Sequence, residues 1–143
     1  MSVRTLRAAV AALALSAPLA VGVGGVGSGA VTTPHLVVTP STGLHNGEWV
    51  KVSGSGFRAH DMVFLVECLS TAKGAAGCNT AGATPVTITA KGVLVSTRFK
   101  VMTGKVGSGH CGTTARNLKG CEMSAGNAAG KDTASTVITF KLP

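Results

Sequence analysis

Four cysteines are the side chains whose type and spacing could do the most definite chemistry. They form two pairs with the same separation of ten positions, Cys68 with Cys78 and Cys111 with Cys121. We predict no metal site, because the sequence has no C-x-x-C motif and only His110 stands beside a cysteine. An even number of cysteines is typical of a disulfide framework in a small exported domain. Several connectivities are possible, and we favour the two local pairs because each brackets a turn-rich loop.

The histidines and carboxylates show no arrangement that points to catalysis. The histidines, at positions 35, 45, 60 and 110, fall mostly in predicted turns. His60 and Asp61 are adjacent, so on a strand their side chains would point apart. The sequence contains no nucleophile elbow, phosphate-binding loop or zinc motif. We therefore predict no catalytic residues and a protein that is not an enzyme.

The first thirty residues read as an export signal. Arg4 and Arg7 form a positive region, residues 8–15 are apolar, and Ser28-Gly29-Ala30 fits a small-x-small cleavage site. We predict a signal peptide over 1–30 that is cleaved near Ala30, followed by one secreted domain over 31–143. A retained membrane anchor is the rival interpretation. It is disfavoured because Ala and Gly dominate the later part of the leader and a proline interrupts it.

The charge balance is basic, with 13 Lys and Arg against 5 Asp and Glu and a formal net charge of +8. Removing Arg4 and Arg7 with the leader gives 8 − 2 = +6 for residues 31–143. This balance favours anionic neighbours such as nucleic acid, teichoic acid or phospholipid head groups. Because the basic residues are scattered along the chain, we interpret them as a solubilising surface. We expect only weak, nonspecific attraction between the protein itself and DNA.

The hydrophobic residues of 31–143 alternate with a period of two, which is typical of half-buried β-strands. We predict inward side chains at Val50 and Val52. The same reasoning predicts inward side chains at Val93, Val95, Phe99 and Val101 in one later strand, and at Ile138, Phe140 and Leu142 in the last. The expected strands cover residues 35–39, 48–53, 62–68, 86–89, 93–101 and 135–142, with short strands around Cys111 and Cys121.

About seven short strands separated by turns indicate an all-β fold, a seven-stranded antiparallel immunoglobulin-like β-sandwich. We expect residues 103–109 to form a loop, after which the strands around Cys111 and Cys121 pair with each other. Two disulfide-stapled hairpins would then project from the sandwich. The pattern leaves two interpretations open for Phe64, a cleft residue or a core residue, and two for Trp49, an exposed anchor for a partner or a side chain packed at an edge.

Several segments, taken in order, resemble the neocarzinostatin family of enediyne chromoprotein apoproteins. The similarity covers nearly all of 31–143, and its ordered combination is more specific than any one segment. The matching segments are Thr39-Pro40-Ser41-Thr42-Gly43-Leu44, Val50-Lys51-Val52, Gly54-Ser55-Gly56-Phe57, Cys68 with Cys78-Asn79, Val86-Thr87, Cys121, Ala125-Gly126-Asn127-Ala128-Ala129-Gly130 and Val137-Ile138-Thr139-Phe140.

The resemblance implies disulfides Cys68–Cys78 and Cys111–Cys121 and a cleft beside the sandwich. In the family this cleft holds a labile, non-covalently bound enediyne chromophore. The freed chromophore cuts DNA, and this makes the family antibacterial. Position by position, the resemblance puts six residues on the ligand-binding cleft: Phe64, Ser70, Ala76, Ala83, Glu122 and Gly126.

This chain departs from its relatives inside the predicted cleft. Ser70 and Ala83 stand where a well-studied member has aromatic residues, and Glu122 stands where it has a neutral amide. We therefore expect a secreted monomer that carries a small apolar ligand and meets DNA through that ligand. The alternative is a secreted or cell-wall-associated immunoglobulin-like interaction module that has lost chromophore binding.

Overall fold

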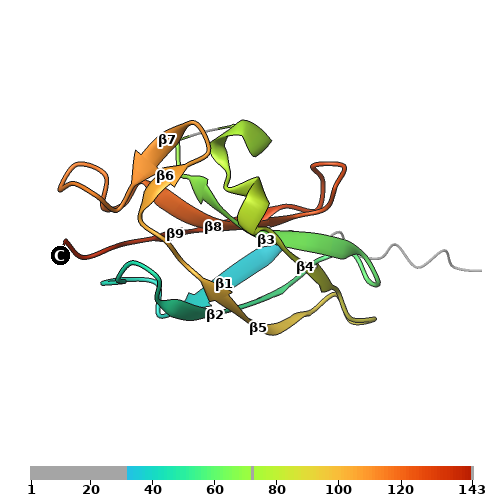
Figure 1. The fold of residues 1–143 in the computed structure, drawn as a ribbon. Helices are drawn as coiled ribbons and strands as arrows, with labels where there is room; N and C mark the ends of the chain where they lie inside the picture. The colour runs from blue at the N-terminus through green and yellow to red at the C-terminus, as the bar shows by residue number, and fades with distance from the viewer. Residues whose placement is uncertain (1–31, 72, 143) are drawn as a thin grey trace, which may run out of the picture.

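The computed structural model describes residues 32–71 and 73–142, and within them it is all-β with two short 3-10 turns. The predicted signal peptide over 1–30 and its cleavage site near Ala30 lie outside the described residues. Two antiparallel sheets pack face to face, with the strand orders β1-β2-β5 and β4-β3-β8-β9, and a separate two-stranded ribbon pairs β6 with β7. Figure 1 shows the three-stranded sheet as the lower layer, the four-stranded sheet above it, and the ribbon and the 3-10 turns on top.

The three-stranded sheet consists of β1 (His35–Thr39), β2 (Trp49–Ser55) and β5 (Leu94–Lys100). The four-stranded sheet consists of β3 (Met62–Leu69), β4 (Thr84–Thr87), β8 (Cys121–Gly126) and β9 (Ala134–Ile138). The ribbon consists of β6 (Gly104–Val106) and β7 (Gly109–Cys111). The two main sheets together have the seven strands that the sequence predicts, and the immunoglobulin-like sandwich is confirmed.

The core lies between the inner faces of the two sheets. Leu36, Val50 and Val52 project into it from the three-stranded sheet, and Leu65 and Met123 meet them from the four-stranded sheet. Val50 and Val52 are inward, as predicted. Hydrophobic alternation along each strand is what selects this face, because a shift of one residue would expose the whole set.

The inward set of β5 differs from the prediction. Phe99 and Val101 are buried as expected, but Val93 and Val95 are 38% and 57% exposed. The pairing of β5 with β2 steps from Val52↔Thr97 to Gly54↔Leu94, so β5 has one residue more than its partner. This β-bulge reverses the alternation, turns Leu94 into the core and leaves Val95 on the outer face.

Three further predictions for the C-terminal half are wrong. Residues 103–109 are not a loop, because β6 and β7 pair through them around a turn at Gly107. The strands at Cys111 and Cys121 belong to different sheets and do not pair with each other. In the last segment Ile138 and Phe140 are buried as predicted, but Leu142 is 46% exposed. A bridge to Leu44 holds Phe140 after β9 has ended, and Leu142 lies beyond that bridge.

Candidate functional site

A cleft lies on the outer face of the four-stranded sheet, and its floor is made by β3 and β8. Val63, Leu65 and Glu67 of β3 point into the core, so the residues between them point outward. Three cross-strand pairs form the floor: Phe64↔Gly126, Val66↔Ser124 and Cys68↔Glu122. Because directly opposed residues of an antiparallel pair share one face, the register alone places these six residues on the cleft floor.

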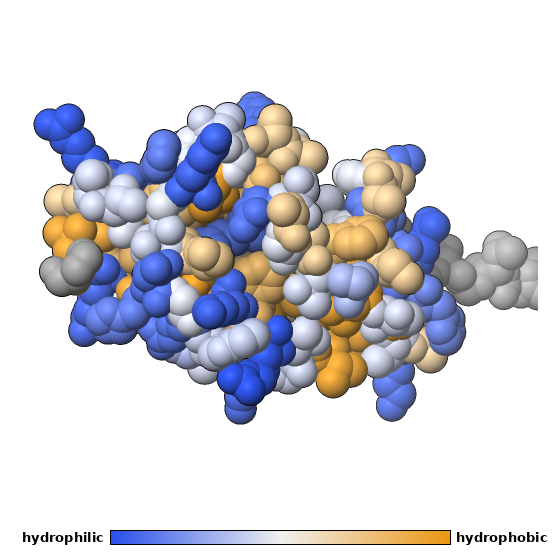
Figure 2. Space-filling view, in the orientation of Figure 1, coloured by the Kyte–Doolittle hydropathy of each residue, from blue (hydrophilic) through white to orange (hydrophobic). Residues whose placement is uncertain are grey.

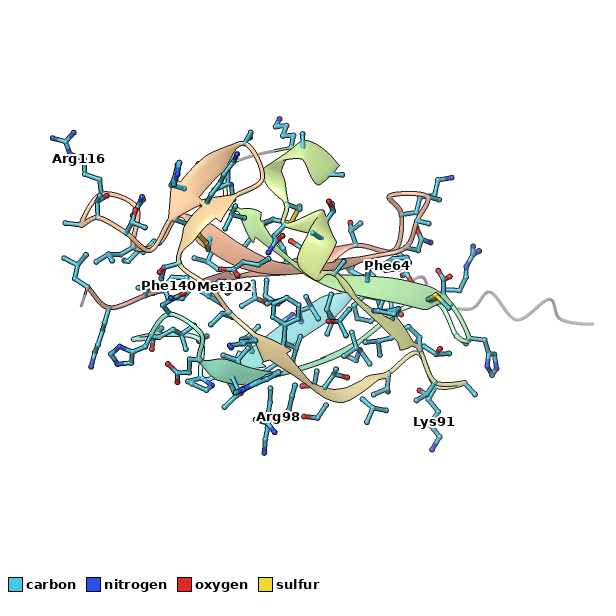
Figure 3. All side chains as sticks on the ribbon, viewed as in Figure 1. Phe64, Lys91, Arg98, Met102, Arg116 and Phe140 are labelled. Atoms are coloured by element: carbon cyan, nitrogen blue, oxygen red, sulfur yellow. A yellow bond between two sulfur atoms is a disulfide. The ribbon has the colours of Figure 1, made fainter. Side chains whose placement is uncertain are left out.

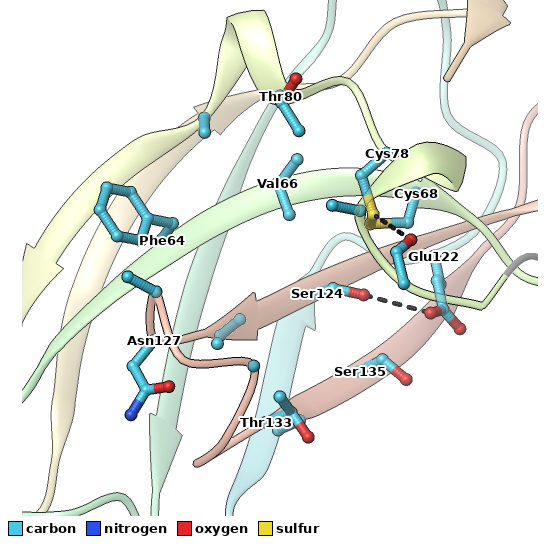
Figure 4. Close-up of a pocket in the computed structure, with 18 residues that line it drawn as sticks. Phe64, Val66, Cys68, Cys78, Thr80, Glu122, Ser124, Asn127, Thr133 and Ser135 are labelled. Atoms are coloured by element: carbon cyan, nitrogen blue, oxygen red, sulfur yellow. Dashed lines mark hydrogen bonds between the residues drawn. A yellow bond between two sulfur atoms is a disulfide. The ribbon is translucent and has the colours of Figure 1, made fainter. Parts of the chain in front are cut away.

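Gly126 lies opposite Phe64 on the floor and beside Thr133 of the rim. A Cβ at Gly126 would come within 3.0 Å of the Thr133 side chain, so a larger residue would crowd this end of the floor. Phe64 is half-buried and its ring lies at the cleft, as Figure 4 shows. The hypothesis that Phe64 is a core residue is therefore wrong for this structure.

The wall of the cleft is the loop that the first disulfide closes. Cys68 of β3 is bonded to Cys78, and between them lies the 3-10 turn Ala75–Gly77. The backbone N–H of Asn79 donates a hydrogen bond of 2.8 Å to the carbonyl oxygen of Glu67, which fixes the loop to β3 just beyond the disulfide. The second turn, Thr80–Gly82, returns the chain to β4. One covalent bond and one backbone hydrogen bond thus hold this wall in place.

The β6–β7 ribbon supports the wall. A Cβ at Gly107 would lie only 2.5 Å from the carbonyl oxygen of Ala76, so the ribbon tip packs directly on the backbone of the first 3-10 turn. A Cβ at Gly109 would lie 2.8 Å from a methyl group of Leu69. The second disulfide, Cys111–Cys121, joins the ribbon to β8. The two disulfides therefore brace one structure, the wall and its support.

The loop between β8 and β9 forms the opposite rim. The Asn127 amide donates to an Asp61 carboxylate oxygen at 2.9 Å, and its own oxygen accepts a hydrogen bond from the Lys131 backbone N–H at 2.9 Å. Asp132 accepts a hydrogen bond of 2.9 Å from the Arg58 backbone N–H. These bonds tie the rim to the segment that precedes β3.

The cleft has a volume of about 880 Å³ and is open to solvent on one side. Most of its lining is apolar or small, and Figure 4 shows the loop on one side and the two strands of the floor below it. The lining residues are Phe64, Val66, Cys68, Gly74, Ala75, Cys78, Thr80, Ala83, Glu122, Ser124, Ala125, Gly126, Asn127, Ala128, Gly130, Thr133, Ala134 and Ser135.

Glu122 gives the cleft its charge. It is the one residue with a formal charge among the described residues that line the space. The Ser124 hydroxyl donates a hydrogen bond of 3.1 Å to its Oε1, and both side chains are half-buried. The carboxylate of Glu122 thus lies on the cleft floor with a serine hydroxyl as its hydrogen-bond partner. Phe64 is the one aromatic side chain in the same lining set.

Four of the six residues predicted for the cleft lie on it: Phe64, Ala83, Glu122 and Gly126. Ser70 and Ala76 are not among the lining residues. Ser70 faces the loop before β8, because its backbone N–H and its hydroxyl donate to the carbonyl oxygens of Gly120 and Lys119 at 2.9 and 3.2 Å. Ala76 is exposed on the 3-10 turn, between lining residues.

Sequence reasoning missed part of the floor and the rim. Val66 and Ser124 lie at the centre of the floor. The resemblance places Phe64 and Glu122 there, and adding the period of two along each strand would also have placed Val66 and Ser124. Thr133 and Ser135, on the far side of β8, become neighbours only through the pairing of β8 with β9. Nothing local in the sequence indicates that pairing.

One cluster resembles a metal site by composition only. Oxygen and sulfur atoms of Glu67, Cys111 and Cys121 lie within 4.8 Å of one another, deep in the core. The two sulfurs are joined in a disulfide, so they offer no thiolate to a metal ion. The close group is therefore a buried carboxyl packed against a disulfide.

Comparison with known proteins gives a consistent result. A family model described as the neocarzinostatin family matches residues 36–140. Macromomycin of Streptomyces macromomyceticus is 31% identical over 112 residues, which cover 75% of this chain and 76% of macromomycin. The antitumor antibiotic C-1027 apoprotein and actinoxanthin, both of Streptomyces globisporus, are 35% and 33% identical over 120 and 115 residues, covering 78% of each chain.

Solved structures agree with the sequence matches. The structure of macromomycin superposes with a TM-score of 0.59 at 32% identity, covering 76% of this chain and 99% of that one. The solution conformation of apokedarcidin superposes with a TM-score of 0.52 at 29% identity and the same coverage. Among the described residues, no helix has the length and apolar character needed to cross a membrane.

Proposed function

The chain belongs to the neocarzinostatin family, and we propose that it binds and shields a small apolar ligand of the enediyne-chromophore type in the cleft above β3 and β8. The observation that carries the proposal is the cleft itself, a space of about 880 Å³ between a sheet and a disulfide-anchored wall. Pockets of roughly 300–1,000 Å³ with mostly apolar walls and few polar groups are typical small-molecule sites.

The protein's contribution would be physical. A ligand on the floor meets Val66 and Phe64 below and the wall at Ala75 and Ala83 beside it. These contacts exclude water and thiols from the reactive part of the ligand while it is bound. No covalent step is asked of the protein, so the proposal is a non-enzymatic carrier, and antibacterial DNA damage would come from the released ligand.

The lining suggests what kind of ligand fits. Phe64 supplies one aromatic surface, and aromatic contacts add about 0.5–1.5 kcal/mol per pair beyond area burial. Glu122, half-buried beside Ser124, favours a ligand with a cationic group near the Cys68 end of the floor. We therefore infer an apolar aromatic ligand with one basic substituent. Its aromatic area would be smaller than that of a ligand bound in a cleft with several aromatic walls.

Secretion of a monomeric domain, after removal of residues 1–30, belongs to the same proposal. It is supported by the arginine-led apolar leader and by the two disulfides, which form readily outside the cytosol. In that setting the chain would meet DNA only through a released ligand or weak charge attraction.

The test uses two aromatic dyes, cationic proflavine and neutral prodan, titrated with the purified protein and followed by dye fluorescence. Trp49 is not a suitable reporter, because it lies on β2 in the other sheet. Ser124→Trp would fill the centre of the floor. Thr87→Trp is the matched control, on β4 of the same sheet but outside the lining set.

We expect saturable binding at micromolar concentrations that Ser124→Trp abolishes and Thr87→Trp leaves within about threefold. Binding that both variants leave unchanged would contradict the proposal. So would the absence of saturable binding by either dye.

A second candidate function is an interaction module that no longer binds a chromophore. It is favoured by Trp49, which is 52% exposed on the sheet that faces away from the cleft. Failure of every dye to bind, together with association through the Trp49 surface, would favour this second function.

A further inference from the structure

The outer face of the three-stranded sheet combines cations, a tryptophan and exposed valines. Its cationic end consists of Trp49, Lys51, Arg98 and Lys100, all exposed. In the register of the sheet Lys51 lies opposite Arg98 and Trp49 lies opposite Lys100, so the four side chains share one face. Figure 3 shows Arg98 projecting outward from the lower edge of the molecule, where hydrophilic side chains gather in Figure 2.

The charges on this face are not balanced within the fold. Lys51 and Arg98 are directly opposed like charges, an arrangement that destabilises a sheet. None of the residues of β1, β2 and β5 is an Asp or a Glu. The nearest acid in sequence, Glu48, accepts a hydrogen bond of 2.8 Å from the His45 backbone N–H. The face therefore has a surplus of positive charge that an anionic surface would neutralise.

Trp49 is held in an outward position. The Arg98 guanidinium lies 4.7 Å from the centre of its ring, a cation–π contact that orders both side chains. Half of the Trp49 surface stays exposed. A tryptophan with one apolar ring and one N–H donor is suited to the boundary between water and lipid acyl chains.

The other end of the same face is apolar. Val37, Val93 and Val95 are 45%, 38% and 57% exposed, and they line a shallow depression of about 450 Å³ together with Ser53. Val95 is there because of the bulge in β5, which turns it away from the core. Four of the eight large hydrophobic side chains that are exposed among the described residues thus lie on this single face.

From these features we propose that the outer face of the three-stranded sheet is a docking surface for a lipid bilayer rich in anionic phospholipids. Lys51, Arg98 and Lys100 would meet the phosphate groups, while Trp49 and the valines enter the interfacial region. The cleft lies on the opposite outer face of the sandwich, so it would point away from the membrane. A docked protein would then hold its ligand near a bilayer with the entrance free.

A soluble polyanion is the competing occupant, and the apolar end decides between the two. Phosphates of a polymer would engage the cations but would gain nothing from Val37 and Val95. A bilayer gains from both ends, because burial of each exposed methyl group adds to the electrostatic attraction. The experiment therefore tests the cationic end and the apolar end with separate variants.

The experiment measures partition of the purified protein onto vesicles of phosphatidylglycerol and phosphatidylcholine, compared with phosphatidylcholine alone. Trp49 is the only tryptophan of the chain, so its emission reports this face directly. We expect binding to the anionic vesicles, a blue shift of the emission, and quenching by bromine-labelled acyl chains. Binding without a change in Trp49 emission would overturn the proposal.

The cationic end is tested with one triple variant and one matched control. Lys51→Gln/Arg98→Gln/Lys100→Gln should weaken partition by at least about tenfold. The matched control Lys105→Gln/Lys119→Gln/Lys131→Gln removes the same charge from exposed residues of the ribbon and loops, and should weaken partition by less than threefold. If the two triple variants lose partition equally, net charge alone would explain vesicle binding, and the proposal would be overturned.

The apolar arm uses Val37→Ser/Val95→Ser. We expect this variant to lose at least about threefold in vesicle binding and to bind a soluble polyphosphate as the parent does. If vesicle binding is unaffected, the face binds polyanions rather than lipid and the proposal is wrong.

Discussion

The carboxylate of Glu67 accepts a hydrogen bond from the backbone N–H of Met102, with Oε2 3.0 Å from the nitrogen, in a side chain that is 1% exposed. Its other oxygen, Oε1, has no hydrogen-bond partner among the described residues. Met102 leads into the β6–β7 ribbon, and the carbonyl oxygen of Glu67 accepts a hydrogen bond from the backbone N–H of Asn79, just beyond the loop that the first disulfide closes. One buried residue therefore connects the cleft floor to both the wall and its support.

Stability should fall as the pH rises because of Glu67. Burial raises the pKa of its carboxyl group to about 7 from an ordinary value of 4.5, against the opposing effect of the Met102 hydrogen bond. The folded state therefore holds a proton that the unfolded chain releases between pH 4.5 and 7. The stabilisation is complete below pH 4.5 and is lost as the pH rises through 7.

The expected contribution of Glu67 to that change is on the order of 3 kcal/mol between pH 4.5 and 8. Urea unfolding of the wild type and Glu67→Gln at both pH values measures it, since the variant should lose this part of the pH dependence. Glu48→Gln, at a half-buried carboxylate outside the core, is the control and should behave as the wild type. A Glu67→Gln profile that parallels the wild type would show that Glu67 does not titrate in this range.

Removing the first disulfide should loosen the cleft wall more than the sandwich. Cys68→Ala/Cys78→Ala opens a loop with a sequence separation of 10. On the chain-entropy estimate this lowers the free energy of unfolding by about 3 kcal/mol. Dye affinity should also fall at least about tenfold under conditions where the variant is still folded by circular dichroism. An unchanged dye affinity in the folded variant would mean that the wall takes no part in binding.

Gly107→Ala should destabilise the contact between the ribbon tip and the cleft wall. Gly107 has φ +50°, and its Cβ would lie 2.5 Å from the Ala76 carbonyl oxygen and the Gly77 carbonyl carbon. The expected loss in free energy of unfolding is about 2–3 kcal/mol, from strain and backbone contact together. Gly130→Ala is the control, because Gly130 has φ +67° with nothing within 4 Å of the added Cβ, and should cost about 1 kcal/mol. If thermal or chemical unfolding shows equal losses for Gly107→Ala and Gly130→Ala, backbone strain alone would explain both, and the contact with the wall would contribute nothing.

Glu122→Gln should lower the affinity for cationic ligands and leave the affinity for neutral ligands nearly unchanged. The variant keeps the shape of the side chain and removes the negative charge from the cleft floor. Proflavine affinity should fall about tenfold, or about 1.4 kcal/mol, while prodan affinity changes by less than twofold. Glu48→Gln removes the same charge outside the lining set and should change neither dye. Equal weakening of both dyes by Glu122→Gln would indicate altered packing instead of a charge contact.

The strands and the paired cysteines could be predicted because period-two alternation and equal spacing are local patterns. The bulge in β5 could not, because Val93 and Val95 alternate correctly in sequence and only the pairing with β2 shows the extra residue. The β6–β7 ribbon was not predicted, because its glycines are typical of a loop. Gly107 is nevertheless needed in the ribbon, where the tip contacts the backbone of the wall.

The cleft was predictable to the extent that it follows strand register. The family resemblance implied Phe64, Glu122 and Gly126, and the observed register of β3 and β8 explains why these three fall on the floor. Ser70 and Ala76 lie in the turn-rich segment after β3, where side-chain direction depends on contacts with Gly120 and Gly107 rather than on a repeating pattern. Distant contacts of that kind leave no signal in a single sequence.

The most direct test of the carrier account is residue-resolved. Amide chemical shifts of the isotope-labelled protein, followed during a titration with prodan, map the binding surface. The account predicts saturable shifts on the floor at Phe64, Val66 and Ser124 and along the wall from Gly74 to Ala83. Shifts confined to β1, β2 and β5, or none that saturate, would contradict it.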